Sequence, residues 1–482
     1  METGAALPTN EKNRSEKTGS VRKIDGFKVS GVFSSHMVLQ RDRRIKIWGF
    51  SDAEGSRVSG SFDGEDAETT VKDGRFELVF GPRKASGQPK TMTVRDDRGR
   101  QTTFDDILTG DVWVIGGQSN AELNLRFSLP ETLPREFDGD SLCRLFMQTQ
   151  AYPYTHQEFC GCPQPDVICP DWHWRRTDKE ASLSFSAIGW FIGTSLSAAL
   201  GIPVGVINMS AGGACIRELI PEELAEEFGY DYGANVRQCG YYNTLIRPFE
   251  GLSFKGMVFF QGESEGGARE LAERYDKELA RLVEDERARF GFGFPFYNVQ
   301  LCSYRGEGKQ YFPYLETVRM KQYDALYTIP DSELTVSMDL GSPEDWPDFA
   351  HSPKKKQLSE RITAQILAKE YGIGRLEDAG SPMPAATEVK DGYVTVKFGR
   401  VSDGLCSRGG GREVKGFSFG DLDGLVPAEA VIASADTVTV KIPDGADPSY
   451  INYAYESNVT EDNAQLIKSN GLPCPAFRIK TK

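Results

Sequence analysis

The sequence predicts an α/β fold in which a parallel sheet of five strands is covered by helices on both faces and flanked by two β-domains. The middle of the chain alternates strand-length apolar runs with longer helical patterns, which is typical of a parallel sheet with crossover helices. Both ends instead show short alternating strands separated by Gly, Asp and Pro turns. Since 482 residues exceed what one compact core organises, we expect roughly two to four domains.

The chain divides most simply into four segments. These are a disordered tail at 1–25, a β-sandwich at 26–108, the α/β domain at 109–378 and a second β-domain at 379–482. Within the first β-domain, the runs that fit strands lie at 29–32, 45–48, 57–61, 69–71, 76–79 and 92–94. Asp-Gly pairs at 63–64 and 73–74 are typical of the tight turns between such strands.

In the α/β domain, strands are predicted at 112–115, 204–208, 256–260, 296–301 and 334–338. Helical patterns lie between or after them at 187–200, 268–290, 315–326 and 353–371. Parallel sheets of this kind bind ligands at the carboxyl ends of their strands, so functional residues are sought there. Residues 124–182 show no clear period and are predicted to form an irregular insertion beside the site.

The second β-domain is predicted from a return to short apolar runs. They lie at 393–398, 417–419, 430–432, 437–442 and 451–455. The glycine-rich stretch at 404–411 is not followed by a helix, so we interpret it as a turn and not as a phosphate-binding loop.

Charge and composition exclude several classes of function. A net charge of −14 argues against binding to nucleic acid or to anionic membranes, which both need clustered Lys and Arg. No apolar run approaches the length that spans a bilayer, and residues 1–22 lack a hydrophobic signal core. We therefore expect a cytoplasmic protein; the alternative is a secreted one whose signal peptide is absent from this sequence.

The nine cysteines are odd in number and lack the spacing of a disulfide framework, so reduced thiols are expected. Cys160, Cys162 and Cys169 share a stretch with His156, but their spacing matches no common zinc motif. We expect no metal site.

A candidate nucleophile lies at the end of the first strand of the α/β domain. In Gly110-Asp-Val-Trp-Val-Ile-Gly-Gly-Gln-Ser-Asn120, an apolar run is followed by two glycines and then by Ser119. A strand that feeds a glycine turn and a helix start would place the Ser119 hydroxyl at the sheet edge, beside converging backbone N–H groups. The alternative is that Ser119 merely caps the helix that follows.

A serine nucleophile needs a base, and the chain has four histidines. His36 lies in the first β-domain, and His156 and His173 lie in the insertion. His351 follows the last predicted strand, on the same sheet edge as Ser119. Asp348, three residues earlier, can hold the imidazole and fix its tautomer, with Asp345 and Asp339 as alternatives.

Two further strand ends carry groups suited to an oxyanion. Met209-Ser-Ala-Gly-Gly-Ala214 is a small-residue turn whose backbone N–H groups at Gly212 and Gly213 could face a developing negative charge. Gln261, after the third strand, could donate from its side-chain amide. Either turn alone is ordinary, but together with Ser119 and the Asp–His loop they predict an acyl-transfer site.

The motifs together resemble the sialate O-acetylesterase family of the SGNH hydrolases, from about residue 29 to residue 477. The matching blocks are His36-Met-Val-Leu-Gln-Arg41, Gly110-Asp-Val-Trp113, Gly117-Gln-Ser-Asn120, 208–213, Tyr242-Asn243, Gln261-Gly-Glu-Ser264 and Gly471-Leu-Pro473. The resemblance implies an SGNH-type (flavodoxin-like) three-layer αβα domain and an esterase without a cofactor. It departs from the family at Ala121, Glu265 and Ser352, where Met, Asn and Pro are usual.

By residue match, the family implies Ser119 as nucleophile and His351 as base. The oxyanion hole would comprise the backbone of Ser119, Gly212 or Gly213, and the side chain of Gln261. The matched blocks also give the expected substrate-binding residues, which are Gln118, Asn120, Asn243 and Glu263. Aromatic faces for a sugar could come from Tyr152, Tyr154, Trp172 and Trp174 of the insertion, although such residues more often pack a loop down.

The sequence thus predicts removal of O-acetyl groups from carbohydrates, with acetylated sialic acid as the first candidate substrate. The same chemistry on acetylated xylan or mannan is the nearest alternative. A non-catalytic sugar-binding protein is the alternative from another class. The sequence leaves the oligomeric state open.

Overall fold

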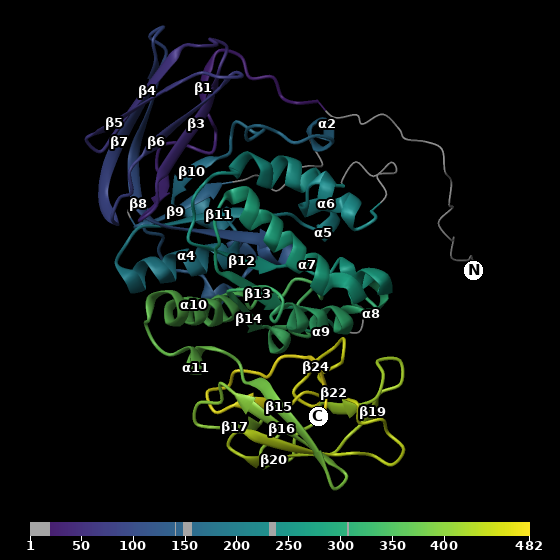
Figure 1. The fold of residues 1–482 in the computed structure, drawn as a ribbon. Coiled ribbons are helices and arrows are strands. Elements are labelled where there is room, and N and C mark those ends of the chain that lie inside the picture. Colours follow the sequence, from purple (N-terminus) through teal and green to yellow (C-terminus); the bar gives the residue numbers. More distant parts are fainter. Residues whose placement is uncertain (1–19, 140, 148–156, 231–237, 306–307) are drawn as a thin grey trace, which may run out of the picture.

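The computed structural model describes residues 20–139, 141–147, 157–230, 238–305 and 308–482 (Figure 1). A central sheet runs in the order β10-β9-β11-β8-β12-β13-β14. Its strands are β8 (Gln101–Gly117), β9 (Cys143–Met147), β10 (His173–Arg176), β11 (Val204–Ser210), β12 (Gly256–Phe260), β13 (Phe296–Gln300) and β14 (Ser332–Val336). All neighbouring pairs are parallel except β10 with β9.

The five predicted strands correspond to β8, β11, β12, β13 and β14, but the sheet is wider than predicted. The extra strands β9 and β10 come from the segment 124–182, so the prediction of a wholly irregular insertion is wrong. Both strands carry arginines where an apolar residue was expected. Arg144 is buried in β9 and pairs with Asp106 of β8, which lets a charged residue occupy an interior strand of the sheet.

Long helices cover both faces of the sheet (Figure 1). On one face α4 (Ala187–Leu200) packs against α10 (Lys355–Tyr371), and on the other α7 (Arg269–Phe290) packs against α9 (Leu315–Ala325). Shorter helices are α1 (Ser119–Glu122), α2 (Gln157–Cys160), α3 (Lys179–Ser184), α5 (Ile216–Leu219), α6 (Glu222–Glu227), α8 (Gly308–Tyr311) and α11 (Leu376–Ala379). Short 3₁₀ helices are Leu125–Phe127, Pro130–Thr132, Arg247–Phe249, Glu265–Gly267 and Met338–Leu340, and Tyr242–Ile246 is a π-helical turn.

The N-terminal β-domain is continuous with the central sheet through β8. This domain comprises β1 (Phe27–Val29), β2 (Val38–Gln40), β3 (Ile45–Ser51), β4 (Arg57–Phe62), β5 (Glu65–Thr70), β6 (Arg75–Phe80) and β7 (Ser86–Asp96). The first half of β8 pairs antiparallel with β7, and its second half pairs parallel with β11 and β12. One strand therefore carries the chain across the expected division at 108 and 109.

Part of the tail that was expected to be disordered is attached to the molecule. Residues 1–19 lie outside the described residues, but Arg22 donates from its backbone to Gln164 and from its guanidinium to the carbonyls of Val167 and Ile168. Residues 20–25 thus follow the surface of the segment 157–182. Across all described residues, no helix has both the length and the apolar character that crossing a bilayer requires.

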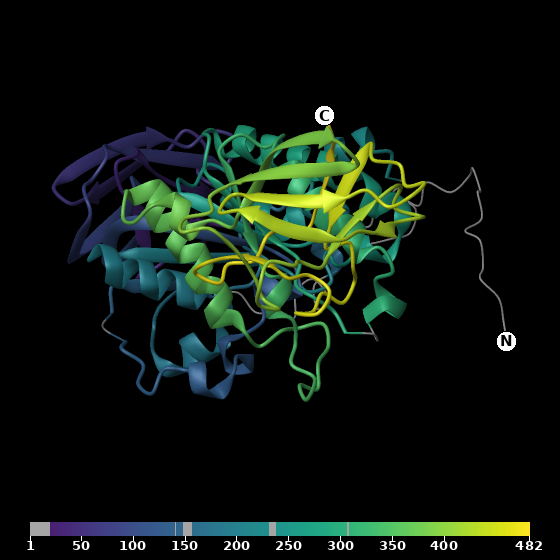
Figure 2. The same ribbon diagram turned by 90° about the horizontal axis from the view of Figure 1, so that it is seen from below.

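The C-terminal β-domain packs against α9 and β14 (Figure 1) and faces the viewer in Figure 2. One sheet has the order β15 (Met383–Lys390), β16 (Tyr393–Gly399), β21 (Thr437–Lys441), β20 (Ala430–Ser434). A second has the order β19 (Val426–Pro427), β18 (Phe417–Phe419), β22 (Tyr450–Tyr453), β24 (Phe477–Lys480), and β17 (Leu405–Ser407) pairs with β23 (Leu466–Lys468). Arg319 of α9 is fully buried at this junction and donates to the carbonyls of Leu301, Cys302, Glu456 and Ser457.

Candidate active site

The turn that carries Ser119 is fixed by a close approach of two backbones. Gly117 ends β8 with φ of +127°, and a Cβ at that position would lie 2.1 Å from the carbonyl oxygen of Phe260. Only glycine fits there, for steric and conformational reasons. The N–H of Gln118 donates to the same Phe260 carbonyl, and Ser119 then begins α1. The half-buried Ser119 is thereby placed at the carboxyl edge of the sheet.

Gln118 ties this turn to the loop after β12. Its side chain is 3% exposed, and its Oε1 atom accepts from the N–H groups of Gly262 and Ser264 and from Nε2 of Gln261, each at 3.3 Å. Gln118 was expected to bind substrate. The described contacts show it joining the β8 turn to the β12 loop, and its role in substrate binding stays a prediction.

Asn120 connects the Ser119 turn to the His351 loop. Its Nδ2 lies 2.6 Å from Oε1 of Glu263, 3.1 Å from the hydroxyl of Tyr304 and 3.0 Å from the carbonyl oxygen of Ala350. The Tyr304 hydroxyl in turn donates to Glu263 at 3.0 Å. Asn120 adjoins Ser119 and Ala350 adjoins His351, so this one amide brings the two catalytic candidates into neighbouring segments.

A buried lysine sets the orientation of the Asn120 amide. Lys355, at the start of α10, is 2% exposed, and its Nζ donates to Oδ1 of Asn120 at 2.6 Å. Because a lysine ammonium can only donate, the oxygen of Asn120 must face it and the NH₂ group must face Glu263 and Ala350. Burial lowers the pKa of Lys355 to about 8 and raises that of Glu263, whose hydrogen bonds from Asn120 and Tyr304 act in the opposite direction.

His351 is paired with Asp348. Its Nδ1 lies 2.6 Å from Oδ2 of Asp348, whose other oxygen accepts from the N–H groups of Ala350 and His351. Partial burial would raise the pKa of Asp348, but the hydrogen bonds from His351 and the backbone outweigh it and the pKa is lowered. Of the two alternatives, Asp339 is bound by Arg361 and Arg408, and Asp345 is exposed.

The turn after β11 lies against the Ser119 turn. A Cβ on Gly212 would lie 3.9 Å from Cβ of Ser119 and 3.0 Å from the carboxylate of Glu122, so a side chain at this position would have to displace that carboxylate. Burial raises the pKa of Glu122 to about 7, against the lowering effect of a hydrogen bond from the Gly212 backbone. Gly212 is therefore brought to Ser119, and Gly213 follows it with φ of +68°.

Gln261 reaches this region, but its amide is already occupied. The side chain is 0% exposed, and its Nε2 donates toward Gln118, the carbonyl of Ala214 and the carboxylate of Glu265. Two amide hydrogens thus serve three protein acceptors, and Gln261 can bind an oxyanion only if one of these bonds opens. Burial raises the pKa of Glu265 to about 7. By contrast, the backbone N–H groups of Ser119 and Asn120 make no hydrogen bond within the described part of the chain.

Asn243 is not brought to the site by any described contact. Its Nδ2 donates to the carbonyl of Cys160 at 2.6 Å and its carbonyl accepts from Gln164, so it anchors the segment 157–182. Trp172 and Trp174 are each 2% exposed and pack as core residues, so they offer no face to a sugar. Tyr152, Tyr154 and His156 lie outside the described residues.

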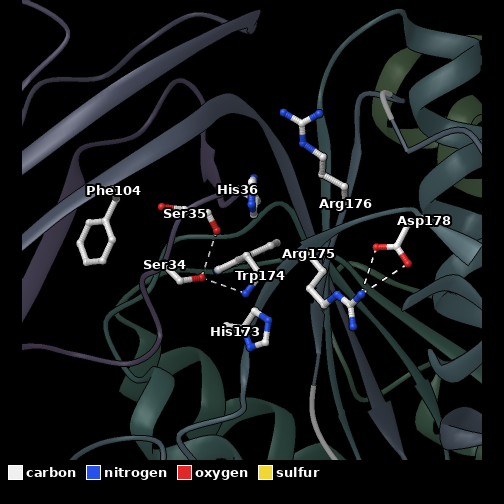
Figure 3. A pocket seen from close by; sticks show the side chains of 9 residues that line it. All are labelled: Ser34, Ser35, His36, Phe104, His173, Trp174, Arg175, Arg176 and Asp178. Carbon is white, nitrogen blue, oxygen red and sulfur yellow. Dashed lines mark hydrogen bonds and ion pairs between the residues drawn. The ribbon is translucent and has the colours of Figure 1, made fainter. Parts of the chain in front are cut away.

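The other described histidines belong to a cavity of about 560 Å³ at the junction of the N-terminal β-domain with β10 (Figure 3). His36 and Arg176 both contact Asp106, and Arg175 pairs with Asp178. His173 bonds the carbonyl of Asp171. Within the described ranges, no three His, Cys, Asp or Glu side chains are grouped so as to hold a metal ion.

Sequence reasoning missed four residues of this region. Tyr304 follows β13 as the other site residues follow their strands, so the same strand-end signal could have revealed it. Glu122, Glu265 and Lys355 lie in local sequences that look like ordinary helix or turn residues. Only their burial beside Gly212, Gln261 and Asn120 reveals them, and burial is a tertiary property.

The comparisons with known proteins define a carboxylic ester hydrolase. The chain belongs to the family described as carbohydrate esterase, sialic acid-specific acetylesterase, whose model matches residues 109–368. The resemblance drawn from the motifs is thereby confirmed.

Individual relatives agree with this assignment. Sialate O-acetylesterase of Homo sapiens is 24% identical over 401 residues, which are 76% of this chain and 75% of that protein. The enzyme of the same name from Mus musculus is 24% identical over 426 residues, 76% of this chain and 77% of that protein. The crystal structure of a carbohydrate acetylesterase from Xanthomonas citri matches with a TM-score of 0.80 and 26% identity, over 95% of this chain and 100% of that one.

Proposed function

We propose that this chain is an SGNH-type serine esterase that removes O-acetyl groups from sialic acids through an acetyl-enzyme on Ser119. The observation that carries the proposal is the Asn120 amide, which fastens the Ser119 turn to the segment that holds His351 and Asp348. Family membership supports the reaction class, and the relatives named sialate O-acetylesterase support the substrate.

In the proposed mechanism, His351 takes the proton of the Ser119 hydroxyl as that oxygen attacks the acetyl carbonyl. Asp348 accepts from Nδ1 of the imidazole, which leaves Nε2 as the basic nitrogen for Ser119 and stabilises the imidazolium that forms. The backbone N–H of Ser119 stabilises the tetrahedral oxyanion, since no described residue accepts from it.

The tetrahedral intermediate collapses when protonated His351 gives its proton to the departing sugar oxygen. This leaves an acetyl ester on Ser119 and a free sugar hydroxyl. A water molecule then repeats the sequence: His351 takes its proton, the hydroxide attacks the acetyl carbonyl, and Ser119 leaves with the proton returned by His351. Acetate is the second product, and the enzyme regains its starting state.

A second substrate class is supported by one specific observation. The Xanthomonas citri structure, which matches nearly the whole chain, is described only as a carbohydrate acetylesterase. Deacetylation of a neutral plant polysaccharide such as xylan or mannan is therefore the competing proposal.

The two proposals are separated by measuring acetate release from a panel of acetylated sugars. We expect a higher kcat/KM for 9-O-acetyl-N-acetylneuraminic acid than for acetylated xylo- or manno-oligosaccharides. A higher value for the neutral oligosaccharides would transfer the assignment to plant polysaccharide. Absence of turnover on the whole panel and on 4-nitrophenyl acetate would leave only the non-catalytic sugar-binding alternative.

A further inference from the structure

A cavity of about 670 Å³ lies between the central domain and the C-terminal β-domain. Ser303, Arg305, 341–344 and Lys354 line it from the central domain. The opposite wall comes from the C-terminal β-domain, at 458–461 and at Pro473 of the Gly471-Leu-Pro473 motif. Its volume is within the range of small-molecule sites, and nothing in the proposed mechanism uses it.

The cavity adjoins the active site through two segments. The loop at 341–354 provides both the His351–Asp348 pair and part of the cavity wall. Tyr304, next to the lining residue Ser303, donates from its backbone to Ser457 of the C-terminal β-domain and binds Asn120 through its hydroxyl. Ser303 follows β13, two strands from β8, so the cavity begins on the order of 10 Å from Ser119 by strand spacing.

The lining suits a neutral ring that carries hydroxyl groups. Three cationic side chains, Arg305, Lys354 and Arg408, and three carboxylates, Asp339, Glu344 and Glu461, line the cavity, and Arg408 is bound directly to two of these carboxylates at 2.8 and 3.1 Å. Met338, Val459 and Pro473 supply apolar surface between these polar groups. The buried hydroxyl of Ser342 has no hydrogen-bond partner within the described part of the chain, so it can serve a ligand hydroxyl.

We propose that this cavity is a distal subsite for a neutral pyranose unit that is linked to the acetylated sugar. The proposal rests on the proposed function, because it presumes that the acetylated sugar lies at Ser119. A cavity two strands away cannot hold the acetylated unit itself, but it can hold a unit further along the same chain. The preferred substrate is then an oligosaccharide and not a free monosaccharide, and the C-terminal β-domain contributes half of its binding site.

Filling the cavity from the C-terminal side tests the subsite. Thr460 is exposed at the rim, so Thr460→Trp occupies the cavity without disturbing the core. Asp462→Trp is the matched control, since Asp462 is exposed in the same turn but does not line the cavity. The probes are 9-O-acetyl-N-acetylneuraminic acid, the same sugar linked to lactose, and 4-nitrophenyl acetate.

The wild type is expected to show a kcat/KM about tenfold higher for the lactose-linked substrate than for the monosaccharide, since each factor of ten corresponds to about 1.4 kcal/mol of binding. Thr460→Trp should abolish this preference through KM, and leave turnover of the monosaccharide and of 4-nitrophenyl acetate unchanged. Asp462→Trp should keep the preference.

Equal kcat/KM for the two sialosides in the wild type, or an unchanged preference in Thr460→Trp, overturns the subsite. If 4-nitrophenyl acetate is hydrolysed but sialosides are not, the same comparison is made with acetylated xylose and acetylated xylotetraose. Equal kcat/KM for these two xylose substrates likewise overturns the subsite. Loss of all turnover, 4-nitrophenyl acetate included, identifies failure of the proposed function instead.

Discussion

At the scale of single residues, the site depends on the amide of Asn120. It donates to Glu263, Tyr304 and the carbonyl of Ala350 while it accepts from Lys355, so segments from four parts of the chain, at 120, 263, 304 and 350–355, meet on one side chain. Hydrogen bonds of this kind fix the positions of the reacting groups on a catalytic loop. Displacing those groups by about 1 Å can lower the reaction rate by roughly 10²-fold.

Replacing Asp348 should reduce catalysis without unfolding the protein. In Asp348→Asn the side chain no longer favours the imidazole tautomer that presents a basic nitrogen to Ser119, so we expect kcat to fall by about 10³–10⁴-fold. Steady-state kinetics on 4-nitrophenyl acetate measure the effect. Asp345→Asn, an exposed position three residues away from Asp348 in the same loop, should retain wild-type kcat. Equal losses in both variants would show that the loop, and not the pair, is responsible.

Lys355→Met should lower kcat about 10–100-fold with little change in KM. The methionine fills the same space but cannot donate to Asn120, so the amide loses its fixed orientation and the hold on Ala350 weakens. Lys356→Met, at the exposed neighbouring position, is the control. A Lys355→Met enzyme with wild-type kcat would mean that Asn120 keeps its orientation without the lysine.

The candidate site could be predicted from sequence where its residues follow strands. Ser119, Asp348 and His351 were recognisable because a glycine turn and an Asp-x-x-His spacing are local patterns. The contact between Gln118 and Gln261 joins residues 143 positions apart, and no local pattern reveals it. The assignment of Gln118 to substrate binding and of Gln261 to the oxyanion hole stays a prediction. Lys355 escaped notice because a lysine at a helix start is ordinarily solvated.

At the scale of elements, strands with a continuous apolar run were predictable and strands with charges were not. β12 and β18 begin and end where the apolar runs do. β9 and β10 were missed because Arg144, Arg175 and Arg176 interrupt the pattern, and their charges are satisfied by Asp106 and Asp178 from other elements. The sequence pattern also did not predict the length of β8, because its first half pairs with β7 and its second half pairs with β11.

The turn after β12 should make stability depend on pH through Glu265. Its folded-state pKa of about 7 lies above the ordinary 4.5, so the folded state keeps a proton that the unfolded state has lost. The contribution of this group to the free energy of unfolding is fully present below about pH 4.5. It is lost as the pH rises toward 7, and the loss amounts to at most roughly 3 kcal/mol. Glu265→Gln should flatten this fall in the free energy of unfolding, measured by urea titration across that window. Glu273→Gln, which changes an exposed carboxylate, should leave the fall with pH as it is in the wild type. Identical slopes in the wild type and Glu265→Gln would refute the assignment of this fall to Glu265.

At the scale of the whole molecule, the two β-domains at opposite ends of the central domain are joined to it in different ways (Figure 1). The N-terminal one shares the strand β8 and a continuous core with the central domain. The C-terminal one shares a core with α9 and β14 and is fastened by the buried Arg319.

Removing the Arg319 guanidinium should loosen the C-terminal junction. Arg319→Leu leaves the carbonyls of Leu301, Cys302 and Ser457 without their buried donor, and each unsatisfied group costs about 1–3 kcal/mol. We expect a fall of about 3 kcal/mol or more in the free energy of unfolding, seen by chemical denaturation. Lys321→Met, on the same helix, should change it by less than about 1 kcal/mol. A comparable small change in both variants would contradict this role for Arg319.

The central claim is that the hydroxyl of Ser119 carries the acetyl group between sugar and water. The most direct test is the turnover of an acetyl ester by Ser119→Ala, with Ser35→Ala of the N-terminal β-domain as control and thermal unfolding measured for both. We predict that Ser119→Ala loses about 10⁴-fold or more of kcat while its unfolding temperature stays at the wild-type value. Turnover within a few-fold of wild type in Ser119→Ala would contradict the mechanism.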